Sequence, residues 1–191
     1  MYAAGLISMA YYYFDFHDVK KHDLYGLLSS LLFQLSTQSD AYFGILSRLH
    51  AENAGGTETP TRSALLKRLK EMLSLPGQAD TFIIVDALDE CPNFTERPSA
   101  RDEVLALIEE LIHLELPGLH ICVASRPEMD IRIALESLEH LQISLHDESG
   151  QKEDIIAYIK AVVNSDRRIR RWVEEDKHLV VDELSQKAHG S

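Results

Sequence analysis

The chain has 191 residues, of which 45% are hydrophobic and 26% are charged, and its formal net charge is -12. A chain of this length suits one domain with one core, and the composition is typical of a globular protein rather than a disordered one. The acidic balance argues against a protein that coats nucleic acid, because phosphate binding needs a surplus of lysine and arginine. We therefore expect no nucleic-acid partner.

The N-terminal stretch 1–14 is apolar, but it lacks a basic segment and leads directly into charged residues. It is also too short to span a bilayer as a helix, which argues against a signal peptide or a membrane anchor. The two cysteines, Cys91 and Cys122, are too few and too far apart to suggest a disulfide framework. These features predict a cytoplasmic protein with reduced thiols and no membrane contact.

Hydrophobic patterning predicts strands that alternate with helices along the chain. The aromatic run 10–16 is typical of a strand, and Asp23 is a suitable cap for a helix in which leucines recur at three- and four-residue steps. The predicted elements, in chain order, are a strand at 10–16, helices at 24–36, 41–50 and 61–73, a strand at 81–85, a helix at 101–114, a strand at 119–124, a helix at 129–138, a strand at 141–145, and helices at 152–164 and 167–188.

The run 81–85 is continuous and rich in β-branched residues, which predicts a strand buried on both faces, as in parallel sheets covered by helices. Strands separated by helices imply βαβ units and a doubly wound parallel α/β sheet. Ligands of such sheets bind at the carboxyl ends of the strands. The polar motifs of this chain fall at those ends.

An acidic cluster, Asp86, Asp89 and Glu90, follows the strand 81–85. A carboxylate held on a rigid strand can position Mg²⁺ or its waters, and a second carboxylate can orient and deprotonate an attacking water. We assign Asp86 to the metal, through water, and Asp89 and Glu90 to water activation. The alternative is an ordinary strand with a solvated acidic turn. The haloacid-dehalogenase phosphatase motif is not matched, because its acids are two apart and are followed by a threonine.

A second polar motif, Ser-Arg-Pro at 125–127, follows the strand 119–124. Arg126 can meet a terminal phosphate there and stabilise its charge. Alone, this motif has little specificity. It gains weight because a single predicted helix separates it from the acidic cluster.

Together these motifs resemble the NACHT domains of STAND P-loop NTPases, especially the nephrocystin-3-like N-terminal type. The segment 85–91 is similar to an extended Walker B motif, and 125–128 is similar to the end of a sensor 1 strand. The strand 10–16 with its leucine-rich helix resembles the second strand and helix of that family. The resemblance implies a partial NACHT nucleotide-binding core over 1–146 and a helical, lid-like segment over 147–191.

The first strand of that family and its phosphate-binding loop, Gly-x-x-x-x-Gly-Lys-Ser/Thr, are not found in this sequence. Backbone N–H groups and the lysine of that loop hold the phosphates, so we expect a partial P-loop NTPase core that binds or hydrolyses nucleotide poorly alone. The resemblance implies Mg²⁺ with ATP or GTP as cofactors of the intact family, and leaves open whether this chain uses any. Nucleotide is expected as a partner only if an upstream loop is supplied.

The resemblance implies that Asp86, Ser125 and Arg126 bind the nucleotide and that Asp89, Glu90 and Arg126 are catalytic. We expect Arg126 to approach the carboxylates at one end of the sheet, where the strands leading to Asp86 and Ser125 are neighbours and the strand 10–16 lies beyond. A missing strand and helix should expose apolar sheet edges, which favours self-association or protein partners. Two alternatives are a protein-interaction scaffold with a residual Walker B motif and a small Mg-dependent hydrolase.

Overall fold

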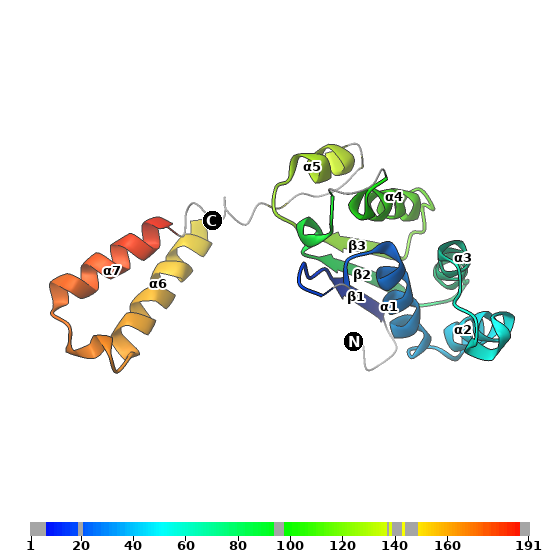
Figure 1. Cartoon of the computed structure of the whole chain (residues 1–191), viewed down its shortest axis with the longest axis horizontal. Coiled ribbons are helices and arrows are strands. Elements are labelled where there is room, and N and C mark those ends of the chain that lie inside the picture. The colour runs from blue at the N-terminus through cyan, green and yellow to red at the C-terminus, as the bar shows by residue number, and fades with distance from the viewer. Residues whose placement is uncertain are drawn as a thin grey trace. The chain divides into compact units, whose positions relative to one another are not determined.

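The structure is a computed structural model that describes residues 7–18, 21–93, 98–136, 138, 143 and 149–187. The chain divides into two compact units, Met1–His140 and Leu141–Ser191. The first unit contains the sheet and both polar motifs (Figure 1).

Among the described residues, the sheet consists of three parallel strands in the order β1-β2-β3. The strands are β1 (Ile7–Tyr13), β2 (Asp80–Asp86) and β3 (Leu119–Val123). Tyr13 is paired with Asp86, and Val85 is paired with Val123. The structure therefore confirms that the strands leading to Asp86 and Ser125 are neighbours and that the aromatic strand lies beyond β2.

Three helices of the first unit, α1 (Leu24–Ser36), α3 (Arg62–Leu73) and α4 (Ala100–Ile112), begin at a residue whose side chain caps them. The Asp23 side chain accepts a hydrogen bond from the Gly26 N–H at 2.9 Å, as predicted, and Thr61 accepts one from Ala64. Ser99 forms a reciprocal capping box with Asp102. The other α-helices described in this unit are α2 (Asp40–Glu52) and α5 (Met129–Glu136).

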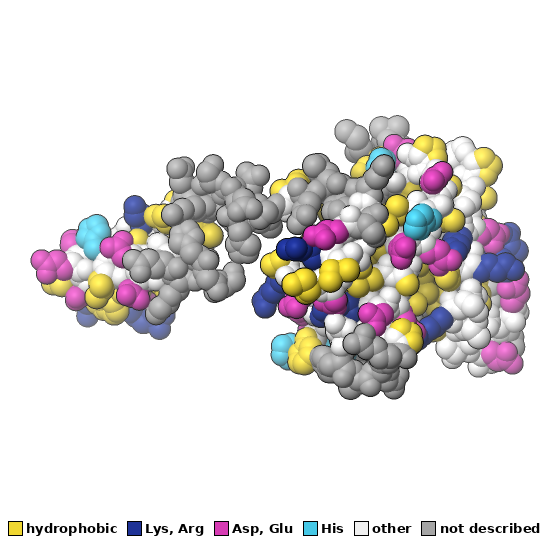
Figure 2. Space-filling model, turned by 90° about the horizontal axis from the view of Figure 1, so that it is seen from above, with side chains coloured by type: hydrophobic (Ala, Val, Ile, Leu, Met, Phe, Trp, Pro, Cys, Tyr) yellow, Lys and Arg dark blue, Asp and Glu magenta, His cyan; other side chains and the backbone are white. Residues whose placement is uncertain are grey.

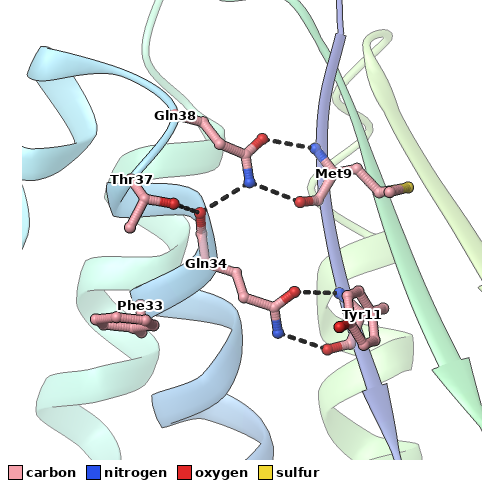
Figure 3. A pocket seen from close by; sticks show the side chains of 6 residues that line it. All are labelled: Met9, Tyr11, Phe33, Gln34, Thr37 and Gln38. Atoms are coloured by element: carbon pink, nitrogen blue, oxygen red, sulfur yellow. Dashed lines mark hydrogen bonds between the residues drawn. The ribbon is translucent and has the colours of Figure 1, made fainter. Parts of the chain in front are cut away.

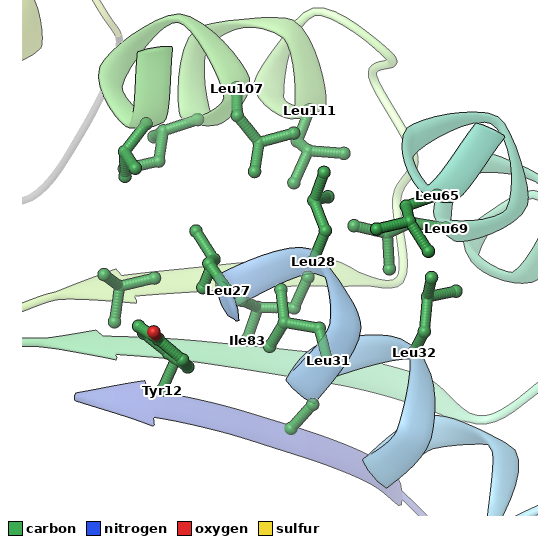
Figure 4. Packing of buried hydrophobic residues seen from close by; sticks show 14 of the residues in the cluster. Tyr12, Leu27, Leu28, Leu31, Leu32, Leu65, Leu69, Ile83, Leu107 and Leu111 are labelled. Carbon is green, nitrogen blue, oxygen red and sulfur yellow. The ribbon is translucent and has the colours of Figure 1, made fainter. Parts of the chain in front are cut away.

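Helix α1 supplies the centre of the hydrophobic core. Its leucines Leu27, Leu28, Leu31 and Leu32 are at most 1% exposed, and they lie between the strands and helices α3 and α4 (Figure 4). A leucine stripe at this spacing forms one face of a helix, so the whole stripe is buried at once. The core then fixes α1 beside the sheet and holds β2 in register with its neighbours.

The prediction that 81–85 is buried on both faces is wrong. Burial alternates along β2, with Ile83 and Val85 at 1–2% exposed and Phe82 at 36% exposed. Tyr11 of β1 lies on the same face of the sheet as Phe82, and it is 55% exposed. A β-branched run reflects strand propensity as well as burial, and here one face of the sheet packs on the helices while the other meets solvent.

The second unit contains α6 (Ser149–Ser165) and α7 (Glu174–Lys187), which form a helical hairpin with Val163 and Val181 buried (Figure 1). The last predicted helix, 167–188, starts later than expected because a short 3-10 turn at Ile169–Arg171 precedes it. The predicted strand 141–145 lies outside the described residues, Ile143 excepted. In the described part of the chain, every helix is too short or too polar to cross a membrane.

Charged side chains of both signs lie among hydrophobic ones on the visible face of the first unit (Figure 2). Basic side chains do not gather there into a continuous patch.

Candidate functional site

A tight turn follows β2 and carries the acidic cluster. Ala87 has a positive φ of 52°, and a one-turn 3-10 helix, Leu88–Glu90, comes after it. The Ala87 N–H donates a hydrogen bond to the Asp86 carboxylate at 2.8 Å, and Leu88 is fully buried beneath the turn. A left-handed conformation costs a residue with a side chain roughly 1–2 kcal/mol. The buried Leu88 and the hydrogen bonds around the turn offset that cost.

The end of β3 is joined to this turn by backbone hydrogen bonds. Ala124 donates to the Val85 carbonyl at 2.8 Å, and Leu88 donates to the Ala124 carbonyl at 3.1 Å. Because the chain continues from Ala124 into the Ser-Arg-Pro motif, these bonds bring both motifs to the same end of the sheet (Figure 1). The predicted neighbourhood of the two motifs is therefore present.

Asp89 is the residue at which the two motifs meet. Its Oδ1 accepts a hydrogen bond from the backbone N–H of Arg126 at 3.0 Å, and its Oδ2 lies 3.6 Å from Nε of Arg126. The Asp89 side chain is 12% exposed, whereas the Arg126 side chain is 82% exposed. The prediction that Arg126 approaches the carboxylates is confirmed for Asp89. The guanidinium itself extends into solvent.

Glu90 lies on the other side of the turn. Its Oε2 accepts a hydrogen bond at 3.0 Å from the backbone N–H of Phe16, which belongs to the loop after β1. The same loop is joined to β2 by a hydrogen bond from Phe14 N–H to the Asp86 carbonyl at 3.1 Å. Glu90 thus connects the acidic turn to the first strand, away from Arg126.

The three predicted carboxylates therefore make separate contacts. Within the ranges that the structure describes, no group of three or more His, Cys, Asp or Glu side chains is arranged to hold a metal ion. Asp86 is exposed at the end of β2. Ser125 is exposed as well, and its hydroxyl donates to the Arg126 carbonyl at 2.7 Å.

Arg101 is a central residue of the site that the sequence motifs did not identify. It is 7% exposed, and its guanidinium donates to the Asp89 carbonyl at 2.5 Å and to the Cys91 carbonyl at 2.9 Å. A further bond, at 3.1 Å, reaches the carboxylate of Asp130 in α5. Arg101 therefore holds the acidic turn to the helix that follows the Ser-Arg-Pro motif. Its one sequence signal is its position, three residues before Val104 on the apolar stripe of α4.

Burial sets the chemistry of Cys91, which closes the turn. It raises the pKa of the thiol to about 12, although the Arg101 charge acts in the opposite direction. A thiol with so high a pKa is uncharged near neutral pH and is a poor nucleophile. The Cys91 Sγ lies 3.5 Å from the His22 carbonyl, so its role is packing between the turn and the start of α1.

The geometry defines a class of protein, a parallel α/β domain in which an acidic turn and a serine–arginine motif lie at the carboxyl ends of adjacent strands. The family model described as Nephrocystin 3, N-terminal, matches residues 3–126, which is 124 of the 191 residues. The chain belongs to this family, and the predicted resemblance to the nephrocystin-3-like N-terminal type is confirmed. The match includes all three strands and ends at Arg126. No curated protein and no solved structure matches the chain.

Proposed function

We propose that this chain is part of a nucleotide-dependent switch module of the NACHT/STAND P-loop NTPase type. The observation that carries the proposal is the junction of Asp89 and Arg126, which lie just after the carboxyl ends of adjacent parallel strands. Open α/β sheets bind ligands at the carboxyl ends of their strands, which is where this junction lies. An acidic turn beside a solvent-exposed arginine suits a triphosphate that arrives with Mg²⁺.

Asp86 is the residue that fits the metal. Mg²⁺ in nucleotide sites keeps several waters and takes one or two carboxylates, the rest of its ligands being phosphate oxygens. A single exposed carboxylate at the end of β2 fits that requirement, whereas a site made only of protein ligands would need more. When bound, the ion would neutralise phosphate charge. Asp86 would hold it through water.

Arg126 is the residue that fits the terminal phosphate. Asp89 fixes its backbone, and its guanidinium is free to turn toward a ligand. One exposed ion pair contributes about 1 kcal/mol or less, whereas micromolar affinity requires roughly 8 kcal/mol. The proposal therefore includes weak nucleotide binding by this chain, with the larger share of affinity coming from a phosphate-binding loop.

Asp89 and Glu90 support control of conformation better than rapid turnover. Asp89 accepts a hydrogen bond from Arg126, and Glu90 accepts one from Phe16. Each contact leaves acceptor sites on the carboxylate, but it ties that carboxylate to the backbone of another segment. We assign both residues to transmitting the state of the nucleotide site, Asp89 to β3 and Glu90 to the loop after β1.

The test is a titration of the whole chain with ATP or GTP, with and without Mg²⁺, followed by amide chemical shifts. Weak, Mg-dependent shifts are expected at the acidic turn and at Ser125 and Arg126, and Arg126→Ala should reduce them. Arg132→Ala is the matched control, since Arg132 is an exposed arginine paired with Glu136 in α5. Shifts confined to other regions, or equal losses in both variants, would contradict the proposed site. Tight one-to-one binding by a monomer would contradict the dependence on a further loop.

A protein-interaction scaffold is the second candidate, and the open face of the sheet favours it. Tyr11, Tyr13 and Phe82 are 55%, 46% and 36% exposed on that face. The scaffold hypothesis predicts that no nucleotide, with or without Mg²⁺, changes the amide chemical shifts of the acidic turn. A small Mg-dependent hydrolase has no such support, because the described residues gather no group of metal ligands.

A further inference from the structure

The outer edge of β1 is covered by side chains of α1. β1 is the first strand of the sheet and pairs with β2 on one side. On its other side, the peptide groups of Met9 and Tyr11 face α1 (Figure 3). Peptide groups along such an edge normally offer a template for a strand from another chain.

Two glutamines occupy this edge. Gln38 accepts a hydrogen bond from Met9 N–H at 2.9 Å and donates one to the Met9 carbonyl at 2.7 Å. Gln34 does the same for Tyr11, at 3.1 and 2.7 Å (Figure 3). A primary amide presents a donor and an acceptor side by side, as a peptide does. Each glutamine therefore makes the two hydrogen bonds that a residue of an added strand would make.

The spacing of helix and strand makes the match possible. Gln34 and Gln38 are four residues apart in α1, which corresponds to about 6 Å along a helix axis. Met9 and Tyr11 are two residues apart in β1, which corresponds to about 6.6 Å along a strand. The two repeats are close enough for both amides to pair at once.

Additional contacts fix the orientation of both amides. Nε2 of Gln34 also donates to the Ser30 hydroxyl at 2.9 Å, and Nε2 of Gln38 also donates to the Gln34 carbonyl at 2.8 Å. Each side-chain nitrogen thus has an acceptor for both of its hydrogens. A fully satisfied amide is costly to displace, because its partners would lose their hydrogen bonds together.

The residues around the two glutamines would favour pairing with another strand if the β1 edge were uncovered. The glutamines line a cleft of about 300 Å³ together with Met9, Tyr11, Phe33 and Thr37. Phe33 is 64% exposed there, and Tyr11 is 55% exposed. Exposed aromatics beside free peptide groups would favour pairing with a second strand.

We infer that Gln34 and Gln38 close the β1 edge of the sheet against strand addition. An incoming strand, from a second copy of this chain in particular, is then excluded from β1, and sheet extension is left to the β3 side. The inference is independent of nucleotide binding. It also refines the expectation of exposed sheet edges, since the peptide groups of Met9 and Tyr11 are already paired.

The test is the double variant Gln34→Ala/Gln38→Ala in the whole chain. Alanine is the best helix former, so α1 should persist, which circular dichroism will verify. In dilute solution, amide hydrogen exchange at Met9 and Tyr11 should rise roughly tenfold, the scale of one lost hydrogen bond. At higher concentration the variant should associate more than the parent chain, and the same two amides should regain protection as β1 pairs with another strand.

Two further variants distinguish the effect of the glutamine amides from that of the residues around them. Phe33→Ala removes one of the two aromatic side chains of the cleft and leaves both amides, so exchange at Met9 and Tyr11 should not change. Gln34→Glu/Gln38→Glu removes the donors to the Met9 and Tyr11 carbonyls, keeps an acceptor for their N–H groups and adds charge, so exchange should rise less than in the alanine variant and association should not increase. Unchanged exchange at Met9 and Tyr11 in the alanine variant would overturn the inference. So would a folded alanine variant that associates no more than the parent.

Discussion

Two arginines contact Asp89, and they differ in almost every physical respect. Arg101 is 7% exposed and donates to two backbone carbonyls and a carboxylate. Arg126 has an 82% exposed side chain, and its Nε lies 3.6 Å from the Asp89 carboxylate. Arg101 is buried and holds the acidic turn in place. Arg126 follows β3, and its side chain extends into solvent. We therefore expect Arg101 to contribute mainly to stability, whereas the exposure of Arg126 suits the recognition role that we propose for it.

The largest effect on stability is expected from Arg101→Ala. The change removes the arginine donor from the carbonyls of Asp89 and Cys91 and removes the ion-pair partner of Asp130, which keeps its hydrogen bond from Asn93. Removing one member of a buried ion pair typically costs about 3–5 kcal/mol, and we expect about 3 because the Asp130 side chain is 31% exposed. Urea unfolding measures the loss.

Arg101→Lys is the matched variant for this prediction. Lysine keeps the charge, but it cannot form the fork of hydrogen bonds to two carbonyls and a carboxylate. It should recover part of the lost stability and not all of it. Full recovery would mean that charge alone matters at this position, and an Arg101→Ala loss below about 1 kcal/mol would remove the contrast with Arg126.

A smaller effect, dependent on pH, is expected from Cys91. Burial raises its pKa in the folded chain to about 12, whereas an unfolded thiol titrates near 8.5. The unfolded state therefore loses its proton first as pH rises, so the free energy of unfolding falls between these two values. The slope is at most about 1.4 kcal/mol per pH unit. Cys91→Ala should flatten it, as measured by urea unfolding at a series of pH values.

Cys122 is the internal control for that prediction. Its thiol is exposed on β3, so alkylation should modify Cys122 in the folded chain and reach Cys91 only after unfolding. Equal alkylation rates at the two thiols would contradict the burial of Cys91. Cys122→Ala should leave the pH dependence of stability in place.

Much of the fold was predictable because its determinants are local. The leucine stripe of α1 lies within 13 residues, and its cap Asp23 directly precedes it. Strand order followed from the resemblance and from the rule that βαβ units form parallel sheets. The approach of Arg126 to Asp89 was predictable for the same reason, since adjacent parallel strands bring their carboxyl ends together.

The remaining features depend on residues that are distant in the sequence. Gln38 and Met9 are 29 positions apart, and so are Arg101 and Asp130. The periodicity of one segment does not show that a polar side chain will contact a residue in a distant segment. The same limit explains the wrong prediction that 81–85 is buried on both faces, because the sequence of a strand does not show how many of its faces are covered by helices. The contact of Glu90 with Phe16 was missed for this reason as well.

The smallest effect on stability is expected from Arg126→Ala. The variant keeps the backbone N–H that Asp89 accepts, and it loses only an ion pair with one highly exposed member. Such pairs contribute about 0–1 kcal/mol, so the free energy of unfolding should change by less than about 1 kcal/mol. A double-mutant cycle with Asp89→Asn isolates the pair, because the asparagine side chain can still accept from that N–H. A coupling energy above about 2 kcal/mol would mean that the Arg126 guanidinium is held as firmly as that of Arg101. It would then have little freedom to reach a phosphate, and the recognition role proposed for it would have to be given up.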